Sequence, residues 1–153
     1  GQMDAIVLYK SPMAQVHSDM KNEERSFDEA LLLWTRAYDN IIKWCARPGF
    51  VRSVIYVNYE DLAGNTQSEM ERICEHLEVQ GPPGDLVEQF ISSSNLGKRY
   101  HCIGCSPHSH RRGEIIVDKD WKKALDDKQK ALCTSGEAGV VLSRLERLRR
   151  VTT

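Results

Sequence analysis

The sequence lacks a marked excess of charge of either sign. Lysine and arginine together number 21 against 22 aspartate and glutamate residues, giving a formal net charge of −1 and a pI near 6.6. The chain has no net positive charge with which to bind nucleic acid or an anionic membrane, which excludes a general nucleic-acid coat protein. A local basic pocket remains compatible with this composition.

Long apolar runs are also missing. No stretch approaches the roughly 20 apolar residues that cross a bilayer, so we expect no membrane segment in this chain. Hydrophobic residues nevertheless make up 41% of the 153 positions, which is enough for one packed core. We therefore predict a single domain over residues 1–153.

Cysteine is odd in number. Five cysteines cannot all pair within one chain, so at least one thiol is free, metal-bound or paired externally. Cys45, Cys74 and Cys133 lie on apolar faces and are predicted to be core side chains. The cysteine count is compatible with a reducing and with an oxidising compartment.

Two short apolar runs are predicted to be strands. Ala5–Tyr9 and Val54–Val57 are continuously apolar, which favours strands covered on both faces. Between them, the Ser-x-x-Glu pattern from Ser26 to Glu29 begins a helix that ends before Pro48. Its apolar stripe comprises Phe27, Leu31, Trp34, Tyr38, Ile41 and Cys45. This order predicts parallel strands with helices packed on the sheet.

Further helices are expected after the second strand. The pattern from Thr66 to Glu69 predicts a capped helix, and Asp118 can cap a short helix that bears Trp121. An amphipathic helix is predicted over 140–148. The residues predicted to be buried in the first of these helices are Met70, Ile73, Cys74 and Leu77.

A third good strand is absent from the pattern. Strands covered on both faces need neighbours, and an isolated two-stranded sheet is only marginally stable in water. Because a core strand begins almost at once, at Ala5, we expect the chain to be an N-terminally truncated part of an α/β domain.

A cation and a hydroxyl follow the first predicted strand. Lys10-Ser11-Pro12 comes directly after it, and Ser18 lies eight positions after Lys10, within a helix. Ligands collect at the C-terminal ends of strands in open α/β sheets, and helix N-termini favour anions, so this arrangement suits a phosphate. The alternative is an ordinary strand-to-helix turn, which is common.

The second predicted strand runs into Tyr59-Glu60-Asp61-Leu62 at the same edge of the sheet. Two carboxylates could form a general acid–base pair. Adjacent carboxylates at a strand end more often cap the next helix or form ion pairs, and we favour that interpretation.

Residues 93–113 show no periodicity and are predicted to form an irregular functional loop. Arg111-Arg112-Gly113 supplies two guanidinium groups suited to phosphate, although a surface arginine pair is usually just solvated. The loop also contains four zinc-type ligands, at Cys102, Cys105, His108 and His110. They are crowded into nine residues, so we favour a disulfide or free thiols and predict no metal site.

Taken in order, these motifs resemble sulfotransferases that use 3′-phosphoadenosine 5′-phosphosulfate. That family has Arg-x-Pro with a serine eight positions on, then Tyr-Glu-Asp-Leu, then Arg-Lys-Gly followed by Asp-Trp-Lys. The corresponding residues here are Lys10-Ser11-Pro12 with Ser18, Tyr59-Glu60-Asp61-Leu62, Arg111-Arg112-Gly113 and Asp120-Trp121-Lys122. The likeness covers about residues 5–148 and implies a three-layer, P-loop-like parallel sheet flanked by helices.

The resemblance also implies roles for individual residues. Lys10 and Ser18 would bind the 3′-phosphate of the donor, Tyr59 would lie near the adenine, and the segment Arg111, Arg112 and Gly113 would close over the nucleotide. Lysine replaces the family's arginine at position 10, and an ammonium cannot make the planar two-bond contact of a guanidinium. We therefore expect a looser phosphate clamp.

The family's 5′-phosphosulfate loop and catalytic base have no recognisable counterpart in this sequence. The resemblance thus predicts part of an enzyme that moves a sulfonate from 3′-phosphoadenosine 5′-phosphosulfate to a hydroxyl or amine, with this chain inactive alone. The resemblance is compatible with a homodimer, and with a location in the Golgi lumen or in the cytoplasm. Two alternatives are a noncatalytic binding or scaffold module and a small zinc-stabilised interaction domain.

Overall fold

The computed structural model describes residues 2–80 and 119–151. The chain divides into two compact units, one formed by Gly1–Asp61 with Asp118–Thr153 and one formed by Leu62–Val117, and each is described by itself. The predicted loop over 93–113 lies outside the described residues.

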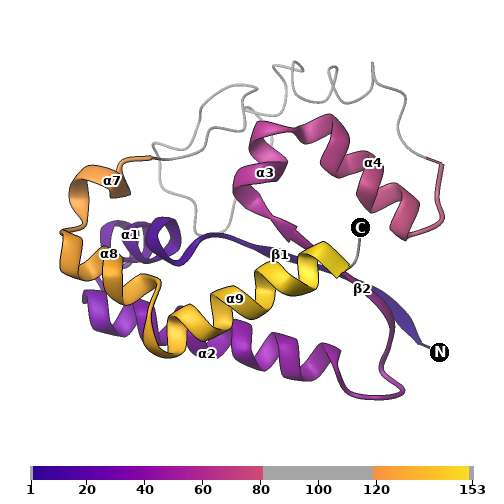
Figure 1. Ribbon diagram of the computed structural model, residues 1–153, viewed down its shortest axis with the longest axis horizontal. Helices are drawn as coiled ribbons and strands as arrows, with labels where there is room; N and C mark the ends of the chain where they lie inside the picture. Colours follow the sequence, from indigo (N-terminus) through magenta and orange to yellow (C-terminus); the bar gives the residue numbers. More distant parts are fainter. Residues whose placement is uncertain (1, 81–118, 152–153) are drawn as a thin grey trace. The chain divides into compact units, whose positions relative to one another are not determined.

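The first unit contains a two-stranded parallel sheet (Figure 1). Strand β1 (Met3–Tyr9) pairs with β2 (Val51–Asn58), and the register sets Val7 opposite Tyr56. Helices α1 (Pro12–Asn22) and α2 (Phe27–Cys45) connect the strands. The predicted strand–helix–strand order with parallel pairing is therefore confirmed.

The two strands differ in how they are covered. Ile55 and Val57 on β2 are fully buried, and Tyr56 between them is 2% exposed, so β2 is covered on both faces as predicted. On β1, Ile6 and Leu8 are each 48% exposed, and the prediction of two covered faces is wrong for this strand. Among the described strands β1 has β2 as its one neighbour, and its outward side chains remain accessible to water.

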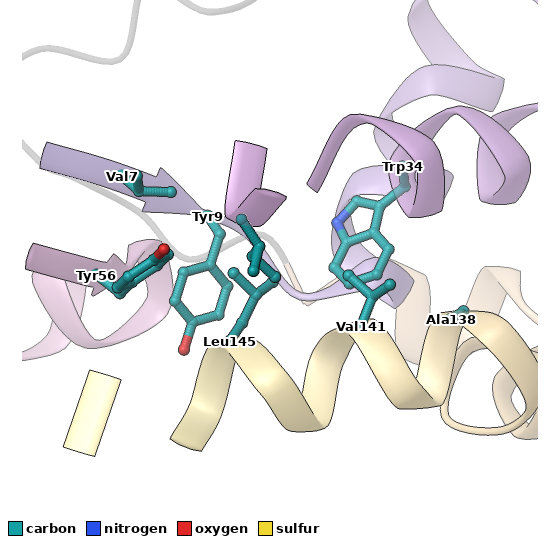
Figure 2. Packing of buried hydrophobic residues seen from close by; sticks show 8 residues of the cluster. Val7, Tyr9, Trp34, Tyr56, Ala138, Val141 and Leu145 are labelled. Carbon is teal, nitrogen blue, oxygen red and sulfur yellow. The ribbon is translucent and has the colours of Figure 1, made fainter. Parts of the chain in front are cut away.

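Helices α2 and α9 (Gly136–Val151) cover one face of the sheet. Figure 2 shows the side chains converging between the strands and the helices. The buried cluster comprises Val7, Tyr9, Trp34, Ile42, Tyr56, Ala138, Val141 and Leu145. Burial of these apolar surfaces is the main force that attaches the C-terminal helix to the sheet.

The helix starts follow the sequence only in part. Ser26 caps α2 as predicted, because its Oγ accepts a hydrogen bond from the Glu29 N–H at 3.3 Å. The predicted cap at Thr66 is wrong, since Asn65 precedes α4 (Thr66–His76). The Thr66 hydroxyl instead donates to the Leu62 carbonyl of α3 (Tyr59–Gly64) at 2.8 Å. Thr66 is therefore the first residue of α4, and its hydroxyl is a donor to the preceding turn and not the acceptor of a cap.

Helix α4 lies in the second unit. Ile73 and Cys74 are buried, as predicted, whereas Met70 and Leu77 are only half-buried, and Glu69 is buried at 8% exposure. Its carboxylate pairs with Arg72 at 2.8 Å, one turn further along the helix. The pairing offsets the cost of burying the charge.

The C-terminal region contains more helix than the pattern indicates. Helix α9 begins four residues before the predicted Val140, and α8 (Asp127–Cys133) was not expected. A reciprocal cap between Asp126 and Gln129 begins α8 and was available in the sequence. Trp121 begins the short α7 (Trp121–Ala124). Within the described ranges, no helix is long and apolar enough to cross a bilayer.

Candidate functional site

The carboxyl ends of the two strands bring two predicted site residues together. Lys10 directly follows β1, and Tyr59 directly follows β2 as the first residue of α3. The Lys10 Nζ atom lies 5.8 Å from the centroid of the Tyr59 ring, which is within cation–π range. A cation and an aromatic face therefore lie side by side at the edge where ligands bind in α/β sheets.

Two aromatic side chains of α2 fix the end of β1. The Trp34 indole N–H donates to the Lys10 carbonyl at 3.1 Å, and the Tyr38 hydroxyl donates to the Leu8 carbonyl at 3.4 Å. Trp34 is only 3% exposed, so its N–H needs such a partner. The sequence interpretation placed both rings in an apolar stripe and missed their polar role.

Glu60 and Asn58 tie the two strand ends to each other. The Glu60 carboxylate accepts a hydrogen bond from the Ser11 backbone N–H at 3.1 Å, across from β2 to the start of α1. The Asn58 side-chain oxygen accepts from the backbone N–H groups of Glu60 and Asp61, at 2.8 and 3.2 Å. Glu60 thus acts as a capping group, but at the start of α1, while the next helix, α3, is capped by the Asn58 amide and not by a carboxylate.

The end of α9 also reaches this edge. The Tyr9 hydroxyl donates to Glu146 Oε1 at 2.7 Å, and Arg149 pairs with Asp61 at 2.6 Å. Burial, followed by the Glu146 carboxylate, raises the pKa of Tyr9 far above its ordinary value. Burial, with a smaller effect of Glu60, raises the pKa of Tyr59. Both phenols are therefore neutral at physiological pH.

Ser18 lies inside α1, the helix that begins at this edge. It is half-buried and its Oγ accepts a hydrogen bond from the Asn22 side-chain amide at 3.1 Å. By the helix rise, Ser18 is about 9 Å along the axis from Pro12. In residues 2–80 and 119–151 we find no hydrogen bond between Ser18 and Lys10.

The remaining predicted positions fall outside the described residues. They are Arg111, Arg112 and Gly113 of the proposed phosphate segment, and Cys102, Cys105, His108 and His110 of the zinc alternative. The part of the chain that is described contains no group of three metal-type ligands.

The other three cysteines behave as core residues. Cys74 and Cys133 are buried free thiols, as predicted, and burial raises the pKa of Cys133 to about 11. Cys45 is also a free thiol and is partly buried against the core. Burial also raises the pKa of Cys45, so neither Cys45 nor Cys133 is a reactive thiolate at neutral pH.

Comparison with known proteins decides the family. A family model described as the sulfotransferase family matches residues 3–83, more than half of the chain. The chain belongs to the sulfotransferase family. Searches of curated proteins and of solved structures find no match.

The family match and the site geometry concern the same part of this sulfotransferase-family chain. The matched residues run from β1 to just past α4 and include Lys10, Ser18 and Tyr59. Arg111, Arg112 and Gly113 lie beyond the match, as does all of α9. Sulfonate transfer is the chemistry of the family in general.

Proposed function

We propose that this chain supplies the 3′-phosphate and adenine side of the donor site of a sulfotransferase. The enzyme would move a sulfonate group from 3′-phosphoadenosine 5′-phosphosulfate to a hydroxyl or amine acceptor. The observation that carries the proposal is the Lys10 ammonium over the Tyr59 ring at the carboxyl edge of a parallel sheet, in a chain of this family.

Each residue has a distinct role in the proposal. Lys10 supplies a positive charge to the 3′-phosphate, and the Tyr59 ring offers a flat apolar face to the adenine. Ser18 adds a hydroxyl donor on α1. Arg111 and Arg112, with Gly113 beside them, add bidentate phosphate contacts from the C-terminal part of the chain.

Binding of the 3′-phosphate contributes to transfer by orientation. Contacts to a remote part of the donor hold its reacting sulfonate in place while the acceptor approaches. The transfer also requires cations on the departing phosphate and a base for the acceptor, and we assign neither to a residue of this chain.

We also propose the three-layer, P-loop-like fold, which the exposed apolar side chains Ile6 and Leu8 on the outer face of β1 support.

Calorimetric titration of the chain with adenosine 3′,5′-bisphosphate tests the proposal. Adenosine 5′-phosphate lacks the 3′-phosphate and should bind more weakly. Lys10→Ala should cost about 1.5–3 kcal/mol of bisphosphate binding, the usual range for a charged hydrogen bond, and should leave 5′-phosphate binding nearly unchanged. Lys21→Ala is the matched control, since Lys21 is an exposed lysine in the last turn of α1, the helix that follows Lys10.

Two results would contradict the proposal. Equal affinity of the parent for the two nucleotides would show that no 3′-phosphate site exists. Equal behaviour of Lys10→Ala and Lys21→Ala would show that Lys10 is an ordinary surface lysine.

A further inference from the structure

Helix α9 lies outside the residues that match the family, yet its last turns reach the candidate donor site. Its buried residues Val141 and Leu145 pack in the core cluster with the strands, which holds the helix in place. Glu146 follows Leu145 directly, and Arg149 lies one turn later on the same side. The helix therefore presents an anion and a cation at the strand ends.

These two side chains join the ends of both strands. Glu146 accepts the hydrogen bond of the Tyr9 hydroxyl at 2.7 Å, and Arg149 lies 2.6 Å from the Asp61 carboxylate. Arg149 also lies 3.6 Å from the other Glu146 oxygen, so Tyr9, Glu146, Arg149 and Asp61 form one connected path. We call these four residues the α9 bridge.

The α9 bridge ends beside each of the two predicted ligand contacts. Tyr9 is the residue before Lys10, and Asp61 is two residues after Tyr59. Tyr9 is fully buried, and its hydroxyl is therefore held in one position by its partner. A displacement of α9 would change the position of Lys10 relative to Tyr59.

We propose that Glu146 and Arg149 are positioning residues of the donor site, and this inference rests on the function proposed above. They do not contact the nucleotide. They hold the ends of β1 and β2 in the relation that lets the Lys10 ammonium and the Tyr59 ring engage one nucleotide at the same time.

A positioning role has a signature that differs from that of a contact residue. Removal of Lys10 should affect only the ligand that carries a 3′-phosphate. Loss of the α9 bridge should misplace the Tyr59 ring as well, and should therefore weaken adenosine 3′,5′-bisphosphate and adenosine 5′-phosphate alike. Substitutions that act through such coupling change affinity by about 2- to 30-fold.

The test measures both nucleotide affinities for the full chain and its variants, together with the thermal midpoint. Arg149→Ala and Glu146→Gln should each weaken both nucleotides by about 2- to 30-fold. Arg147→Ala, an exposed arginine of the same helix, should change neither by as much as twofold. Exchanging the charges in the double variant Asp61→Arg with Arg149→Asp should recover part of the affinity lost in Arg149→Asp alone, because the exchange restores the pair between positions 61 and 149 but sets a carboxylate beside Glu146. If Arg149→Ala does not fold, Arg149→Lys and Tyr9→Phe serve instead.

The outcomes separate the two proposals. If Lys10→Ala weakens the bisphosphate while Arg149→Ala and Glu146→Gln bind both nucleotides as Arg147→Ala does, the donor site holds and the positioning inference is overturned. A loss confined to the bisphosphate would also overturn it, because Arg149 would then act as a phosphate contact. A parent chain that binds neither nucleotide would remove the proposed function and this inference with it.

Discussion

The two ends of the small parallel sheet differ in how their polar groups are arranged. At the carboxyl end, Tyr9 and Asn58 are buried, and Glu60 links β2 to α1. At the amino end, Met3 and Phe50 are 52% and 55% exposed. The polar contacts there lie nearer to water, since the Arg52 side chain that pairs with Asp4 is 56% exposed.

This difference indicates which end of the sheet holds its side chains in fixed positions. Buried hydrogen-bonded groups cannot rearrange without losing partners, so they hold nearby side chains in fixed positions. The pair of Asp4 with Arg52 has two hydrogen bonds, but its arginine is 56% exposed, so water and salt screen the pair and it contributes less than a buried pair would. Both ends carry aromatic rings and charges, but the described contacts favour a ligand site at the carboxyl end.

The largest expected effect comes from the same substitution made at the two ends of β2. Val57→Ala removes two buried methyl groups from a fully buried position and should destabilise the fold by about 2–3 kcal/mol. Val51→Ala, at the partly exposed amino end, should cost less than about 1 kcal/mol. Urea unfolding of both variants measures the difference. Equal costs would show that the two ends are packed alike.

The sequence predicts the elements of this region better than their boundaries. The β-branched runs identify both strands, and the stripe from Phe27 to Cys45 matches α2 over its whole length. The exposure of Ile6 and Leu8 could not be predicted, because a run of apolar residues does not show which face of the strand other elements will cover. The cap at Thr66 failed because Thr66 is the first residue inside α4, and its hydroxyl donates to the Leu62 carbonyl four residues earlier instead of accepting from a backbone N–H.

Alkaline pH should lower the stability of the fold through Tyr56, which lies in the carboxyl half of β2. Burial raises the pKa of Tyr56 to about 12 from an ordinary value of 10.0. Between these values the unfolded chain releases the proton and the folded chain keeps it, so stability falls as pH rises, by at most about 1.4 kcal/mol per unit for this group.

Urea unfolding at several pH values from 8 upwards checks this dependence. Tyr56→Phe lacks the ionisable hydroxyl, and its stability should fall less steeply than that of the parent above about pH 10. Parallel curves for the parent and the variant would show that Tyr56 is as accessible to ionisation in the folded state as in the unfolded state.

A smaller difference in stability is expected when a polar group is removed at one or the other end of the sheet. Asn58→Ala removes the acceptor of two backbone N–H groups at the start of α3 and should cost about 1 kcal/mol, as for loss of a helix cap. Arg52→Ala breaks an exposed pair and should cost less than about 0.5 kcal/mol. Thermal unfolding at low and high salt measures both, and only the Arg52 effect should be reduced by salt. A larger cost for Arg52→Ala would reverse the comparison.

The candidate site was accessible from the sequence only through its local motifs. Lys10 and Tyr59 each follow a predicted strand closely, and Ser18 lies in the helix after the first strand, so the carboxyl edge could be identified without a structure. The groups that hold this edge come from far along the chain: Trp34 through its indole N–H, and Glu146 and Arg149 from α9. Their spacing shows no motif, because side chains that meet only in the folded state need no fixed separation.

The smallest expected effect on nucleotide binding tests whether the carboxyl end retains the phosphate geometry of the family. The family's motif has an arginine where this chain has Lys10, and a guanidinium can form two parallel hydrogen bonds with a phosphate. Lys10→Arg should therefore tighten adenosine 3′,5′-bisphosphate by about 0.5–1 kcal/mol, or about two- to fivefold, without a matching gain for adenosine 5′-phosphate. Lys43→Arg makes the same change at an exposed lysine of α2, far along the helix from its start, and should leave both affinities unchanged. A weaker bisphosphate complex for Lys10→Arg would mean that the Tyr59 ring and the surrounding backbone have adapted to an ammonium, and that the space at this edge no longer accepts a planar group.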